Sequence, residues 1–180
     1  MMFSTHTVLA DTNPIVAAAR MQVGQTVIYD PAYVGLAFPG GDVDRRRGVC
    51  SDVVIRALRD AHGFDLQLQV NTDMKQNFAA YPANWGLTRP DKNIDHRRVH
   101  NLRRFFERRG EDIRVSDNGA NYQPGDIVSW RLPGNLTHIG VVSDRLQGTT
   151  PLIIHNIGAG TQEEDILFMF EITGHFRSKL

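Results

Sequence analysis

Residues 48–58 read GVCSDVVIRAL and contain the single cysteine of the 180-residue chain. In a helix that begins at Cys50, four apolar residues share one face with the cysteine, because they follow it at spacings of three, four, seven and eight: Val53, Val54, Ala57 and Leu58. The first N–H groups of a helix lack internal partners, and the helix dipole favours negative charge there. The pattern predicts a thiol with a lowered pKa, whose thiolate is a nucleophile. The same N–H groups would hold an oxyanion. The alternative is a small buried residue that opens a core helix.

The composition is typical of one globular domain, and we expect a single domain over residues 1–180. Lys and Arg together number 20, as do Asp and Glu, so no global field attracts nucleic acid or an anionic membrane. One cysteine excludes an intramolecular disulfide. No apolar run is long enough to insert into a bilayer, and residues 1–25 lack the pattern of a signal peptide. We expect a soluble protein that is made in the cytoplasm.

Helical patterns occupy the first part of the chain and strand patterns the last. Helices are expected at residues 15–23, from 50 to Gly63, within 66–81, and at 101–109. Strands are expected at residues 127–130, 137–143, 152–156 and 166–172. Helices followed by an antiparallel meander predict an α+β fold with the helices packed on one side of the sheet.

A catalytic cysteine needs a base, and His138 is the strongest candidate in the sequence. It lies in the apolar strand 137–143 and shares a face with Gly140, which leaves room beside it. The alternative is a satisfied core histidine. Either His155 or Asn156, at the end of the next strand, would orient the imidazole. An odd sum of paired residue numbers would favour His155 and an even sum Asn156.

Four segments occur in the order found in NlpC-like peptidoglycan amidases, which are papain-like enzymes. They are a tyrosine-bearing loop (DPAYVGLAFPGGD), the cysteine at a helix start (GVCSDVV), a turn into a strand (PGDIVSW), and THIGVVSD followed by LIIHN. The longer text over residues 26–178, including YDPAYV, WGLTRPDKNIDHRRVHNLRRFF and ITGHFR, resembles the YijF-like bacterial family of unknown function. We place that family in the NlpC-like superfamily.

The resemblance implies a papain-like, NlpC-type fold with the nucleophile at a helix N-terminus. It implies Cys50 as nucleophile, His138 as base, His155 as the third polar residue, and Tyr33 as a tyrosine that shapes the oxyanion site. No cofactor and no metal are expected. The sequence departs from the NlpC pattern where Asp52 replaces a glycine. That carboxylate would either complement the helix dipole or raise the pKa of the thiol.

A second departure is an insert at about residues 66–109. His96 and His100 are four apart, but no third ligand has metal-site spacing. Arg97 and Arg98 are candidates for binding a substrate carboxylate, with Trp85 lining the cleft. The alternative is a solvated basic helix start with Asp95 as its N-cap.

These expectations combine into a cysteine amidase or endopeptidase that cuts amide bonds of peptidoglycan stem peptides, in the periplasm or cell wall. A secreted antibacterial effector with an immunity protein as partner would fit. The alternatives are a cysteine peptidase or deamidase acting on a protein, and a catalytically inactive wall-binding module.

Overall fold

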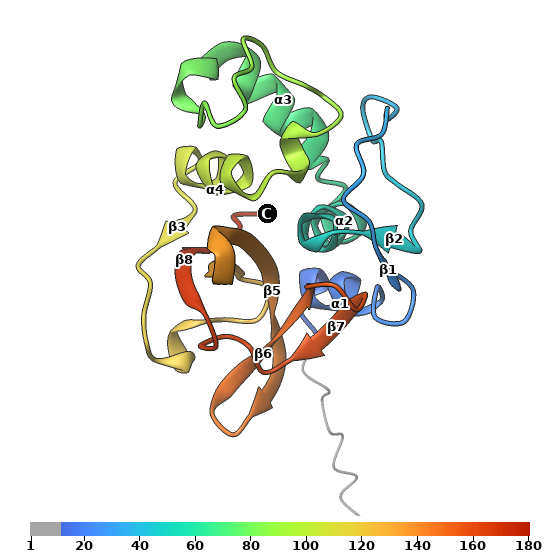
Figure 1. Cartoon of the computed structure of the whole chain (residues 1–180). Coiled ribbons are helices and arrows are strands. Elements are labelled where there is room, and N and C mark those ends of the chain that lie inside the picture. The colour runs from blue at the N-terminus through green and yellow to red at the C-terminus, as the bar shows by residue number, and fades with distance from the viewer. Residues whose placement is uncertain (1–11) are drawn as a thin grey trace, which may run out of the picture.

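A computed structural model describes residues 12–180 of the chain (Figure 1). It has a mixed α+β fold in which four α-helices accompany a six-stranded antiparallel sheet. The helices are α1 (Pro14–Arg20), α2 (Cys50–His62), α3 (Leu66–Asn77) and α4 (Val99–Arg108). Single 3-10 turns lie at Phe78–Ala80, Asp95–Arg97, Gly119–Asn121 and Pro133–Asn135. No helix among the described residues is long and apolar enough to cross a membrane. Residues 1–11, part of the segment 1–25 that was searched for a signal-peptide pattern, lie outside the described part.

The sheet has the strand order β3-β8-β4-β5-β6-β7, with every neighbouring pair antiparallel. Its strands are β3 (Asp112–Ile113), β4 (Ile127–Leu132), β5 (Leu136–Gln147), β6 (Thr150–Asn156), β7 (Thr161–Glu164) and β8 (Glu171–Phe176). A separate parallel pair joins β1 (Ile28–Tyr29) to β2 (Arg47–Gly48), directly before α2. The expected α+β class and antiparallel sheet are confirmed.

The two faces of the sheet are covered differently. The main core joins the apolar face of α2 to the sheet through residues such as Val53, Leu58, Ile139 and Val141. The other face carries a smaller cluster of Tyr122, Val128, Trp130, Val142, Ile153, Ile166 and Leu167, in which loop residues take the place of helices. The helices therefore pack on one side of the sheet, as the sequence predicts (Figure 1).

Helix α2 follows its sequence pattern at both ends. It begins at Cys50 and ends at Gly63, whose φ of 65° is the left-handed conformation that favours glycine at this position. Helix α1 starts one residue before the expected boundary, at Pro14, and the Asn13 side chain caps it by accepting from the N–H of Ile15 at 2.9 Å. Helix α4 starts two residues before the expected boundary, at Val99.

The strand expected at 166–172 is wrong. Residues 165–170 form a turn, and the real strands lie on either side of it as β7 and β8. Ile166 and Leu167 are both buried although they are adjacent, which a half-buried strand does not allow because its side chains alternate between faces. The turn instead tucks both side chains against the outer face of the sheet.

Candidate active site

Cys50 is held between the N-terminus of α2 and strand β5. The backbone N–H groups of Ile139 on β5 and of Cys50 and Ser51 at the helix start lie near its sulfur, where they act to lower the pKa of the thiol. The paired part of β5 and β6 ends at Val141 and Ile154, so the Ile139 amide is available to the sulfur. The nucleophile candidate therefore sits where the two strands separate.

The segment before Cys50 is fixed from two sides. Asn156, fully buried at the end of β6, donates from Nδ2 to the carbonyl oxygen of Gly48 at 3.1 Å. Asp52 accepts the N–H of Val49 at 2.7 Å, as the third helical residue does in a capping box. These contacts set the angle at which the chain enters α2. Asn156 thus positions the backbone rather than the imidazole of His138.

The pKa of the Cys50 thiol is raised to about 11, which overturns the expected lowering. Burial is the largest cause, because a thiolate loses its hydration there, and the charge of Asp52 raises the pKa further. The three backbone N–H groups act in the opposite direction without offsetting burial. Cys50 is thus a neutral thiol in this structure. Of the two effects considered for Asp52, the increase of the thiol pKa is the one present.

His138 belongs to a chain of three side chains. Its Nε2 lies 3.0 Å from Nδ1 of His155, and Nε2 of His155 lies 3.0 Å from a carboxylate oxygen of Glu164. Both imidazoles are buried, while the side chain of Glu164 on β7 is half exposed. Val141 pairs with Ile154, so the register has the odd sum that favours His155, and the two imidazoles meet diagonally.

This chain fixes the tautomer of His138. The carboxylate of Glu164 only accepts, so His155 donates from Nε2 and its Nδ1 is the acceptor in the neutral ring. His138 must then donate from Nε2, which leaves its Nδ1 unprotonated. Burial lowers the pKa of His138 to about 3, with a smaller contribution from His155. Burial also lowers the pKa of His155, against the opposing effect of Glu164. His138 is a neutral imidazole with a free lone pair.

Within residues 12–180, Cys50 and His138 make no hydrogen bond with each other. Both lie beside the peptide bond that joins His138 to Ile139. The β5 amide that lies near the sulfur belongs to Ile139, and its nitrogen is bonded to the carbonyl carbon of His138. Along β5, Ile139 faces the core beneath α2, whereas His138 pairs with Trp130 on the other face, with ring centroids 5.7 Å apart. Sulfur and imidazole therefore approach the same peptide bond from its two sides.

A buried ion pair connects the nucleophile helix to the insert. Arg97 donates from Nε and Nη2 to the two carboxylate oxygens of Asp52, at 2.9 and 2.8 Å, and only 3% and 4% of their side chains are exposed. The Ser51 hydroxyl donates to the backbone oxygen of Arg97 at 2.8 Å. The segment before α4 is thus attached to the first turn of α2. Arg97 is not part of a solvated helix start, and Asp95 is a buried residue of a 3-10 turn rather than the N-cap of α4.

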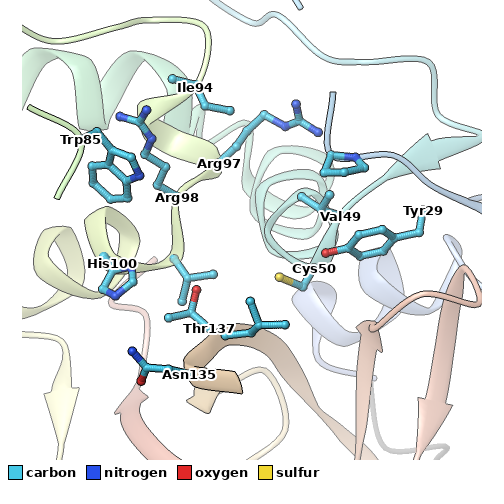
Figure 2. Close-up of a pocket in the computed structure, with 13 residues that line it drawn as sticks. Tyr29, Val49, Cys50, Trp85, Ile94, Arg97, Arg98, His100, Asn135 and Thr137 are labelled. Carbon is cyan, nitrogen blue, oxygen red and sulfur yellow. The ribbon is translucent and has the colours of Figure 1, made fainter. Parts of the chain in front are cut away.

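Cys50 lines a cleft of about 370 Å³. Figure 2 shows Tyr29 and Cys50 on one side of it, and Trp85, Arg98 and His100 on the other. The remaining lining residues are Pro31, Val49, Ile94, Arg97, Val99, Asn135, Leu136 and Thr137. The insert of 66–109 therefore supplies one whole wall of the cleft.

Six of the expected site residues do not line the cleft, namely His138, His155, Asn156, Asp52, Tyr33 and His96. Tyr33 is 59% exposed, and its hydroxyl instead lies 3.0 Å from the Asp91 carboxylate. Tyr29 takes the expected place, with its hydroxyl directed toward Cys50 (Figure 2). Burial raises the pKa of Tyr29, and negative charge on Cys50 would raise it further, so the phenol remains a donor. His96 is buried outside the cleft, and burial lowers its pKa to about 4.

Sequence reasoning missed Glu164 and Tyr29. Glu164 lies in a polar strand, TQEE, with no hydrophobic alternation, so only the pairing of β7 with β6 brings it to His155. Tyr29 and Tyr33 lie in the same irregular segment of the sequence. Only the pairing of β1 with β2, in which Tyr29 lies opposite Gly48, brings Tyr29 rather than Tyr33 close to Cys50. Within residues 12–180, no group of three or more His, Cys, Asp or Glu side chains is arranged to hold a metal ion.

Comparison with known proteins places nearly the whole chain in one family. Residues 16–178 match a family described as a domain of unknown function, DUF1287. The chain is 59% identical over 170 residues to the uncharacterized protein YijF of Escherichia coli (strain K12), an alignment that covers 93% of this chain and 82% of that protein. The match spans the cysteine helix, the insert and the sheet, and the chain belongs to the DUF1287 family.

Proposed function

We propose that the protein is a cysteine amidase or endopeptidase of the papain-like NlpC type, and that it hydrolyses amide bonds of peptidoglycan stem peptides. The observation that carries the proposal is the meeting of Cys50, at the start of α2, with the peptide bond of His138, whose imidazole is oriented by His155 and Glu164. A nucleophile, a base and an orienting group in this order are the parts of a cysteine hydrolase. The sequence resemblance supplies the substrate class.

Acylation would begin from the neutral thiol. The sulfur attacks the carbonyl carbon of the scissile amide, while its proton passes to Nδ1 of His138. The oxyanion that forms accepts hydrogen bonds from the first N–H groups of α2 and from the hydroxyl of Tyr29. The protonated imidazole then donates its proton to the departing amine, which leaves a thioester on Cys50.

Deacylation reuses the same base. Water loses a proton to Nδ1 of His138 as it attacks the thioester carbonyl. The tetrahedral intermediate collapses, the carboxylic acid product leaves, and the proton returns to the Cys50 sulfur. The route requires that binding of substrate bring Sγ of Cys50 and Nδ1 of His138 to hydrogen-bond distance, since hydrogen bonds between catalytic groups often form fully only in the substrate complex.

Digestion of purified peptidoglycan tests the proposal. The wild-type protein is expected to release new amino ends, measured by mass spectrometry of the soluble fragments. Cys50→Ala and His138→Ala should each lower the rate by roughly 10²-fold or more. His62→Ala, at the exposed end of α2, is the control and should retain the wild-type rate. No release by the wild type, or full release by Cys50→Ala, would refute the proposal.

One observation favours a second candidate function. The buried, neutral thiol of Cys50 is also what a wall-binding module without catalysis would contain. Such a module would bind peptidoglycan equally well as wild type and as Cys50→Ala, and neither would release fragments. The proposed enzyme acts in the periplasm or cell wall, and an immunity protein would be its partner if it is a secreted effector.

A further inference from the structure

The two arginines at the start of α4 have different surroundings, although they are adjacent in the sequence. Arg97 donates two N–H groups to the two carboxylate oxygens of Asp52, and this ion pair is buried. Arg98 donates one hydrogen bond, from Nη1 to a carboxylate oxygen of Asp95 at 3.0 Å. Its Nε and Nη2 make no hydrogen bond to any residue within 12–180. Arg98 lines the cleft that contains Cys50.

The guanidinium of Arg98 is held in place before any ligand arrives. It lies over the ring of Trp85, with its central carbon 4.0 Å from the ring centroid. His100 contacts the same ring edge-on, at 5.9 Å between centroids. Stacking and the single bond to Asp95 fix the plane of the fork, so little side-chain entropy remains to be lost on binding. Trp85 itself is 37% exposed beside the cleft.

From this arrangement we infer that Arg98 and Trp85 form a subsite for a carboxylate on the part of the substrate that lies across the cleft from Cys50. A planar fork with two free N–H groups matches the two oxygens of a carboxylate. A phosphate would call for more positive charge, but Arg97 is neutralised by Asp52 and burial keeps His100 neutral by lowering its pKa. Substrates therefore carry a carboxylate near the scissile amide.

The inference rests on the proposed function, because only an enzyme has a substrate. Binding of a carboxylate at the subsite can nevertheless be tested without catalytic turnover. Cys50 lines the same cleft, so an occupant should protect the thiol from iodoacetamide. The probes are acetyl-Ala-Ala with a free C-terminal carboxylate and the same peptide as its carboxamide, each at millimolar concentration and pH 8.5. The measured quantity is the rate of alkylation.

In the wild type, we expect the carboxylate peptide to protect Cys50 at about tenfold lower concentration than the carboxamide, as a charge-assisted pair of hydrogen bonds predicts. Arg98→Met should abolish the difference, and Arg98→Lys, which keeps the charge without the fork, should retain part of it. Arg114→Met is the matched control, because Arg114 is an exposed arginine that lines a different cavity.

Equal protection by both peptides in the wild type would overturn the inference, as would an unchanged preference in Arg98→Met. Failure of the proposed function looks different. In that case the carboxylate preference and its dependence on Arg98 remain, while purified peptidoglycan is not cut. Thermal unfolding of each variant, measured by circular dichroism, shows whether a lost preference reflects a lost fold.

Discussion

At the scale of single residues, the charge of Asp52 affects the thiol and can be removed by mutation. Asp52 raises the pKa of Cys50, and Arg97 pairs with both of its oxygens. Arg97→Met leaves the carboxylate unpaired beside the sulfur, so we expect the pKa of Cys50 to rise by about one unit or more. Asp52→Asn should lower it. The rate of iodoacetamide alkylation against pH measures both shifts.

The double variant separates charge from packing. Asp52→Asn with Arg97→Met removes both charges, so its thiol pKa should fall below that of Arg97→Met alone. Removing one partner of a buried pair typically costs about 3–5 kcal/mol, so each single variant should also unfold at lower urea concentration than the double variant. If the pKa of Cys50 is the same in all variants, Arg97 is only a structural attachment for the insert.

The tautomer of His138 gives a second prediction at this scale. Nitrogen-15 NMR of the imidazole rings should show Nε2 protonated and Nδ1 unprotonated in wild-type His138, because His155 accepts at Nδ1. In His155→Ala that acceptor is gone, and we expect a mixture of both tautomers. Glu164→Gln keeps an acceptor oxygen near His155 and should leave the tautomer of His138 unchanged. A protonated Nδ1 in the wild type would contradict the proposed base.

At the scale of elements, the sequence predicts what a local pattern determines. The start of α2 at Cys50 and its end at Gly63 follow from apolar spacing and a left-handed glycine. Strand β7 could not be predicted, because its polar residues are strand only through pairing with β6. The same holds for Glu164, which reaches His155 by that pairing. Likewise, no local sequence pattern shows that Arg97 forms an ion pair with Asp52 whereas Arg98 keeps two N–H groups without a hydrogen bond within residues 12–180.

Strands β5 and β6 approach closely at Gly140, and this contact positions the two histidines. A Cβ on Gly140 would lie 2.8 Å from Cγ2 of Ile153 and 3.1 Å from Cβ of His155. We expect Gly140→Ala to destabilise the fold by about 1–3 kcal/mol through overpacking, measured by urea unfolding. Gly35→Ala is the control, since its Cβ would meet nothing within 4 Å and should change stability little. The room expected beside His138 is thus occupied by β6.

At the scale of the whole molecule, the insert contacts both the sheet and the start of α2. Phe106 of α4 packs against Phe176 of β8, and Arg103 donates to the carbonyl oxygen of Thr173. The insert supplies Trp85 and Arg98 to one wall of the cleft, and the sheet supplies His138 from the other side of β5. The insert is attached to the first turn of α2 at Arg97, which contacts Ser51 and Asp52, one and two residues beyond the nucleophile. Arg98 directly follows Arg97, so the chain connects the proposed carboxylate subsite to the first turn of α2, where Cys50 lies.

Buried neutral histidines make the stability of the whole molecule depend on pH. Burial lowers the pKa of His96 to about 4 and that of His138 to about 3, whereas an unfolded histidine titrates near 6.5. Below pH 6.5 the unfolded chain therefore binds more protons than the folded one, and stability falls as pH falls. Between pH 7 and pH 5, each of these histidines should remove about 2 kcal/mol from the free energy of unfolding.

Urea unfolding at pH 7, 6 and 5 measures this dependence. His96→Gln cannot titrate, so its stability should fall by about 2 kcal/mol less than that of the wild type over the same range. His62→Gln, at an exposed position, should follow the wild type. Carboxylates whose pKa the fold lowers, such as Asp126, affect the free energy of unfolding mainly below pH 4. The change between pH 7 and pH 5 is therefore assigned to the histidines. An identical pH dependence in wild type and His96→Gln would show that His96 is protonated in the folded protein, and that its side chain is not sealed from water.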